Sequence, residues 1–204
     1  MYSNIQLYGE HPNNTKVIFT DEGYLVIECN GISQLANLTL QGDTGVSTVY
    51  FEKGKLLVEN CNITSSKSNA LWLINKAQAV IKNSFISGYQ RGLSVAGKSV
   101  AKAVNCQFTN TNNDRGAYVE DSVLFAENCQ FSSVKSNSAC VQLNGSGFFN
   151  NCNFKSRAAG ITSYSGNVYL YKCSYSGSDK ITSHNHQEVY SPNTIPSDEK
   201  ILNR

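Results

Sequence analysis

The chain has 204 residues, of which 40% are hydrophobic and only 16% charged, with a formal net charge of +2. This length accommodates one domain or one elongated solenoid. The small net charge does not favour nucleic acid or an anionic membrane as a partner. No apolar run approaches the roughly 18 residues that span a bilayer, and the N-terminus lacks the basic and apolar segments of a signal peptide. We therefore expect neither a nucleic-acid nor a membrane partner.

The first predicted elements are strand-like segments at residues 5–10 and 16–18. A sequence LANLT at residues 35–39 then introduces a pattern that returns along most of the chain. Five clear copies follow, and in a sixth copy Lys172 replaces the asparagine. The copies are NCNIT at 60–64, NSFIS at 83–87, NCQFT at 105–109, NCQFS at 128–132, NCNFK at 151–155 and KCSYS at 172–176. Successive copies are 23, 22, 23, 23 and 21 residues apart, which identifies a structural repeat.

Hydrophobic residues alternate with polar ones on both sides of each asparagine, as in strands with one buried face. Asparagine tolerates the left-handed conformation that a bend between two strands requires. A third strand-like run follows each bend, at residues 70–73, 92–95, 116–119, 139–141 and 160–163. In the fourth of these runs either Cys140 or Val141 faces outward. Three short strands in each repeat, with no helical segment, predict a three-faced β-coil.

Stacked coils bring equivalent residues into ladders about 4.8 Å apart. We expect one ladder of asparagines at the bend and, beside it, a ladder of buried thiols. The chain has seven cysteines, five of them at one repeat position. Parallel side chains at this spacing disfavour a disulfide, and the odd number of thiols favours a reducing, cytoplasmic compartment.

These inward stacks and the asparagine bend resemble the pectate-lyase-like right-handed parallel β-helix superfamily over about residues 5–176. The resemblance implies an all-β, right-handed, single-stranded parallel β-helix of about seven or eight coils, each of about 23 residues with three short strands. In texture the repeats are similar to the carbohydrate-binding and sugar-hydrolase type repeats that recur as interaction modules in F-box and adaptor proteins. We therefore divide the chain into a β-helix at 1–176 and a C-terminal cap or tail at 177–204.

An enzyme of this superfamily would work from the third-strand face, where hydrolases need carboxylates from neighbouring coils. The candidates there are Asp114, Glu120 and Asp121, all from a single coil. Solvated turn residues are the favoured interpretation, and the sequence favours a protein without catalytic residues. His184-Asn185-His186 lacks a cysteine or acidic cluster beside it, so we predict no metal site and no cofactor.

Two features of this face favour binding. Trp72 and Tyr118 are expected to face outward two coils apart, where they could stack on sugars or anchor a protein. A loop that covers Trp72 is the alternative. Basic residues in the loops that lead into the third strand could form a stripe about 20 Å long, or could be ordinary solubilising charge. They are Lys67, Arg91, Arg115, Lys135, Lys155 and Arg157.

These observations favour a non-catalytic recognition or scaffold module of a larger protein, beside other domains of a parent chain. Its expected ligand is a protein or an extended anionic ligand, such as an anionic polysaccharide, bound along the third-strand face. The alternative is a carbohydrate-active enzyme, either a polysaccharide lyase or a glycoside hydrolase, or a sugar-binding remnant of one. A third possibility is a segment of a phage or surface adhesin.

Overall fold

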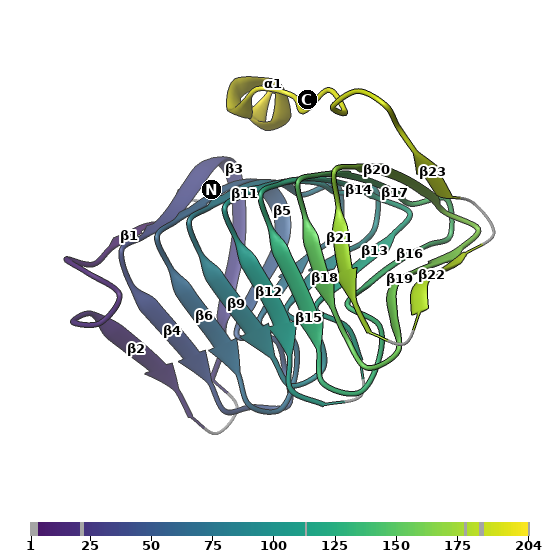
Figure 1. The fold of residues 1–204 in the computed structure, drawn as a ribbon. Helices are drawn as coiled ribbons and strands as arrows, with labels where there is room; N and C mark the ends of the chain where they lie inside the picture. The colour runs from purple at the N-terminus through teal and green to yellow at the C-terminus, as the bar shows by residue number, and fades with distance from the viewer. Residues whose placement is uncertain (1–3, 21–22, 113, 178, 184–185, 204) are drawn as a thin grey trace.

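A computed structural model describes residues 4–20, 23–112, 114–177, 179–183 and 186–203, with the backbone alone at 28–30 and 179–183. The chain winds into a solenoid of about seven turns whose strands all pair in parallel with the coil before and after (Figure 1). Each regular coil has three strands, which confirms the predicted three-faced β-coil. We call the three sides the first-strand, second-strand and third-strand faces, in chain order around the asparagine bend.

The second-strand face is an eight-stranded parallel sheet that begins directly after each bend. Its strands are β2 (Lys16–Phe19), β4 (Thr39–Gly42), β6 (Asn62–Ser65), β9 (Phe85–Gly88), β12 (Gln107–Asn110), β15 (Gln130–Ser133), β18 (Asn153–Lys155) and β21 (Ser174–Ser176).

The first-strand and third-strand faces are joined at the N-terminal end, because β3 and β5 run from one face to the other without a break. The first-strand face consists of β1 (Gln6–Tyr8), β3 (Leu25–Ala36), β5 (Val49–Glu59), β8 (Gln78–Lys82), β11 (Val100–Val104), β14 (Val123–Glu127), β17 (Ser146–Asn150), β20 (Asn167–Tyr171) and β23 (His186–Glu188). The third-strand face continues from β5 with β7 (Leu71–Leu73), β10 (Leu93–Val95), β13 (Ala117–Glu120), β16 (Ala139–Gln142), β19 (Ala159–Tyr164) and β22 (Asp179–Ser183).

The bend between the first two faces has the left-handed backbone that the sequence predicts. Asparagines at this position have φ between 48° and 56°, from Asn37 to Asn151, and Lys172 has φ 50°. Side-chain amides bond from coil to coil, with Nδ2 of Asn60 donating to Oδ1 of Asn37 at 2.8 Å. The ladder therefore satisfies polar groups at the bend and starts one coil earlier than the first clear repeat.

The interior is a stack of equivalent side chains. Phe131 lies between Phe108 and Phe154, with ring centroids 5.3 and 5.1 Å apart and nearly parallel planes. Cys106 and Cys129 are buried, free thiols beside this stack. The neighbouring Cys129 thiol and burial raise the pKa of Cys106, which keeps it protonated and unreactive. The core is therefore explained by packing alone.

The chain continues beyond the last coil of the solenoid. After β23 it turns back and crosses the outside of the first-strand face, ending in the short helix α1 (Asp198–Leu202) above β8 and β11 (Figure 1). We call residues 189–203 the strap. Ile201 is fully buried against Val80 and Phe125, which point outward from that face.

Polar contacts hold the strap at two further points. Asn193 exchanges two hydrogen bonds with Asn150, at 2.8 and 2.9 Å, and Asp198 forms ion pairs with Lys82 and Lys102. The strap therefore covers a lateral face of the solenoid. Among the described residues, no helix combines the length and apolar character needed to cross a bilayer.

Candidate binding face

The outward side of the third-strand face carries a central column of side chains in register. It contains Tyr50, Trp72, Ser94, Tyr118, Cys140 and Thr162, one from each successive strand from β5 to β19. Cys140 is therefore the outward residue of its strand, and Val141 lies in the core. This settles the register that the sequence left open.

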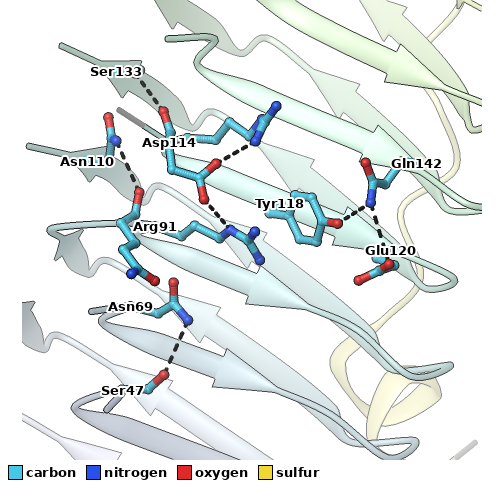
Figure 2. Close-up of polar contacts among 11 residues, drawn as sticks. Ser47, Asn69, Arg91, Asn110, Asp114, Tyr118, Glu120, Ser133 and Gln142 are labelled. Atoms are coloured by element: carbon cyan, nitrogen blue, oxygen red, sulfur yellow. Dashed lines mark hydrogen bonds and ion pairs between the residues drawn. The ribbon is translucent and has the colours of Figure 1, made fainter. Parts of the chain in front are cut away.

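Two arginines occupy equivalent positions on adjacent coils beside this column. Arg91 and Arg115 each lie two residues before the paired Leu93 and Ala117. The carboxylate of Asp114 accepts from Nε of Arg91 at 2.7 Å and from Nη1 of Arg115 at 2.6 Å (Figure 2). The three side chains are only 23–26% exposed, so Asp114 relieves the repulsion between two half-buried like charges.

Tyr118 faces outward, as predicted, but it is only 7% exposed. The prediction that it presents an exposed aromatic ring is therefore wrong. The cause is Arg91, whose guanidinium carbon lies 3.7 Å from the centre of the Tyr118 ring. The Tyr118 hydroxyl is engaged by Gln142, which also contacts Glu120 (Figure 2). Burial, and then the Glu120 carboxylate, raise the pKa of Tyr118. Tyr118 is thus part of a closed network and offers little surface to a ligand.

The remaining basic residues do not continue this cluster as one strip. Lys67 forms an ion pair with Asp43 at 3.4 Å, and both side chains are more than half exposed. Lys135 is exposed at a loop tip, whereas Lys155 and Arg157 border a separate hollow beside the outward glutamines of the second-strand face. The basic residues of the predicted stripe therefore form separate local groups. Lys67, Arg91 and Arg115 are paired with carboxylates.

The three candidate catalytic carboxylates lie at the two ends of β13. Asp114 precedes this strand and binds two arginines, Glu120 ends it beside Gln142, and Asp121 is exposed in the following turn with φ 44°. A glycosidase uses two carboxyl groups about 5–9.5 Å apart as its acid and its base or nucleophile. Asp114 is held in ion pairs with Arg91 and Arg115, so it is not free to act as one of such a pair.

A hollow of the third-strand face lies at its N-terminal end, around Trp72. A pocket of about 380 Å³ is lined by Tyr24, Tyr50 and Trp72, with Glu52 as a further lining residue. The remaining lining residues are Val26, Gly45, Val46, Ser47 and Ser68. Trp72 is half-buried and meets Tyr50 edge to face, with ring centroids 5.2 Å apart. Trp72 thus lines an open pocket, and part of its side chain is covered by neighbouring residues.

Sequence reasoning identified Trp72 but missed its partners. In β5, Tyr50 and Glu52 alternate with the buried Val49 and Phe51, so period-two alternation marks both as outward. Tyr24 is separated from Tyr50 by one coil, outside the clear repeats, and no local pattern connects it to Trp72. Only the stacking of β3, β5 and β7 brings the three rings together.

Within the described residues, no group of three histidine, cysteine or acidic side chains lies close enough to hold a metal ion. Of the histidine pair considered above, His184 lies outside the described residues.

Comparison with known proteins agrees with this architecture. A family model described as a right-handed beta helix region matches residues 23–174. The chain belongs to the right-handed β-helix family. No curated protein sequence matches this β-helix chain. Among solved structures it is similar to full-length tailspike protein 2 of Escherichia coli O157:H7 bacteriophage CAB120, with 10% identity and a TM-score of 0.48. That match covers 91% of this chain and 37% of the tailspike chain.

Proposed function

We propose that this β-helix is a non-catalytic recognition module of a larger protein and that it holds its ligand in the pocket around Trp72. The observation that carries the proposal is the pocket itself, where aromatic rings from three consecutive coils line one hollow. Aromatic side chains supply most of the binding free energy in recognition sites, because they bury large areas with little conformational entropy. A protein segment is the proposed ligand.

The arrangement of carboxylates supports binding over catalysis. Asp114 is neutralised by two arginines, and Asp121 lies at the opposite end of β13. Asp114 is therefore not free to serve as one of the two carboxyl groups that glycoside hydrolysis needs. The proposed pocket also differs from the anionic-ligand site expected along this face, because the charged side chain among its described lining residues is that of Glu52.

A binding panel tests this function. The immobilised chain is offered arrays of peptides and of neutral and uronate glycans, beside a Tyr24→Ala variant. Tyr24 is 44% exposed, so its removal trims the pocket and spares the core. We expect peptide ligands that bind the parent chain at least about tenfold more tightly than Tyr24→Ala, whereas Tyr164→Ala, which removes a comparably exposed tyrosine, binds normally.

Two results would overturn the proposal. One is turnover of a uronate polymer, with or without calcium, that Asp121→Ala abolishes. The other is ligand binding that Tyr24→Ala leaves unchanged and that loss of the arginine pair removes, which would return the site to the basic part of the face.

A further inference from the structure

The pocket around Trp72 has the ring geometry of a cation site. The Tyr50 and Trp72 rings are nearly perpendicular, at 87°, and Tyr24 adds a third ring to the lining. The face of an aromatic ring carries negative potential and attracts a cation within about 6 Å of its centre. Rings in different orientations around one hollow attract a cation from several sides, whereas one flat platform suits a sugar ring better.

The charge of the pocket lining is negative, like the potential at the faces of the rings. Among the described residues that line it, the charged one is Glu52, and Nδ2 of Asn75 donates to its Oε1 at 3.1 Å. Burial, followed by Glu52 and Tyr24, raises the pKa of Tyr50, as expected beside a carboxylate. A cation entering the pocket would meet a carboxylate and aromatic rings, while an anion would meet repulsion.

The apolar part of the lining distinguishes between cations. Val26 and Val46 border the pocket and are themselves 43% and 39% exposed. They offer apolar contact to methyl groups, whereas a primary ammonium would have to place its three donors on the acceptors of the lining, Glu52, Ser47 and Ser68. A quaternary ammonium carries its charge under methyl groups and is the cation that aromatic cages bind best.

We propose that the pocket around Trp72 is an aromatic cage for a trimethylammonium group, presented by a trimethylated lysine of a protein partner. This inference rests on the proposed recognition function and names its ligand. A lysine side chain is favoured over a choline headgroup because choline phosphates would place a phosphate near Glu52, and the described residues of the pocket lining include no cation.

The chain contains a single tryptophan, Trp72, so its intrinsic fluorescence reports directly on this pocket. The probes are N-acetyl-trimethyllysine amide, the unmethylated lysine amide, phosphocholine, choline and 3,3-dimethylbutan-1-ol, the neutral isostere of choline. We expect trimethyllysine to bind roughly tenfold more tightly than lysine, because both are cations but the trimethylammonium group gives up less hydration on entering the pocket. We expect choline to bind roughly tenfold more tightly than its isostere, because only choline carries the charge that the ring faces attract.

Variants then assign the binding to the cage. Glu52→Gln removes the charge at constant shape, and Tyr50→Leu removes one ring and keeps an apolar side chain. Each is expected to weaken trimethyllysine binding by about three- to thirtyfold. Tyr24→Ala is a further variant that leaves the buried part of the column intact. The matched control is Glu59→Gln, a carboxylate on the same strand β5 but beyond the corner, on the first-strand face.

Each outcome decides the proposal. One such outcome is equal affinity for choline and its neutral isostere, with both affinities lost in Tyr50→Leu. This result would overturn the cation cage. The pocket would then be an apolar binding site, and the proposed recognition function would survive. Stronger binding of phosphocholine than of trimethyllysine would overturn the protein source. No fluorescence change with any probe would overturn the cage, and the peptide array would then decide the proposed function separately.

Discussion

Two lateral faces of this solenoid carry outward apolar side chains, and they are covered in different ways. On the first-strand face Val80 and Phe125 are buried by the chain's own strap through Ile201. On the third-strand face Tyr118 is covered by Arg91 from a neighbouring loop, while Tyr50 and Trp72 stay partly open at a pocket. Stacking fills only the interior of a β-helix, so a group of outward apolar residues is buried only where another segment or side chain covers it. The uncovered group is where a ligand is expected.

The largest effect is predicted where the strap is anchored. Ile201→Ala removes a fully buried side chain from the contact with the first-strand face. We expect the docked strap to lose about 2–4 kcal/mol, since the short helix α1 has little stability of its own. Hydrogen exchange of the strap amides measures this loss. Glu199→Ala, at an exposed position of α1, serves as the control, and unchanged protection in Ile201→Ala would refute the anchoring role.

On the third-strand face the corresponding change is Asp114→Ala. It leaves two half-buried arginines side by side without their shared carboxylate. We expect a loss of about 1–3 kcal/mol in the free energy of unfolding, less than for fully buried pairs because the three side chains keep some contact with water. Denaturant unfolding measures the loss. Asp121→Asn, which keeps a residue that tolerates positive φ, should be nearly neutral, and an equal effect in both variants would contradict this prediction.

Acid should release the strap from the first-strand face. Burial raises the pKa of Asp198, but the hydrogen bonds and charges of Lys102 and Lys82 outweigh it and hold this pKa below 3.8. A lowered folded-state pKa adds stability above the unfolded value of 3.8, and this stability is lost as pH falls through the folded pKa. Strap protection should therefore drop below about pH 4. Asp198→Asn should remove this pH dependence, and a parent-like profile in that variant would count against it.

The smallest effect is predicted at the asparagine bend, which connects the first-strand and second-strand faces. Lys172 adopts φ 50° at the position where the preceding coils have asparagine. Lys172→Asn should stabilise the fold by about 0.5–1 kcal/mol, because asparagine tolerates the left-handed region better and extends the amide ladder beyond Asn151. Thermal unfolding measures the gain. Because Lys172 also lies near Tyr171, Lys172→Gln is the control that removes the charge without relieving the backbone, and it should give no gain.

The repeat made most of the fold predictable from sequence. The asparagine bend, the inward cysteines and aromatics and the third strands all follow from period-two alternation around a fixed residue, a local signal copied in every coil. The binding face was less predictable. The sequence placed Trp72 on the third-strand face and the arginines in the loops that lead into it. It treated Arg91 and Arg115 as free charges, because the ion pair that connects Arg91 to Asp114 joins two coils.

By itself, the sequence determined the coil: its length, its three strands, its left-handed asparagine bend and its buried ladders. These depend on local backbone preferences and on stacking between equivalent residues, and both repeat along the chain. Only the tertiary structure decided what covers the outside. Ile201 packs with Val80, and Tyr24 lines the same pocket as Trp72. The members of each pair are far apart in the sequence and do not occupy equivalent repeat positions. Such contacts depend on where a non-repeating segment comes to lie, and that is decided by the packing of the whole molecule.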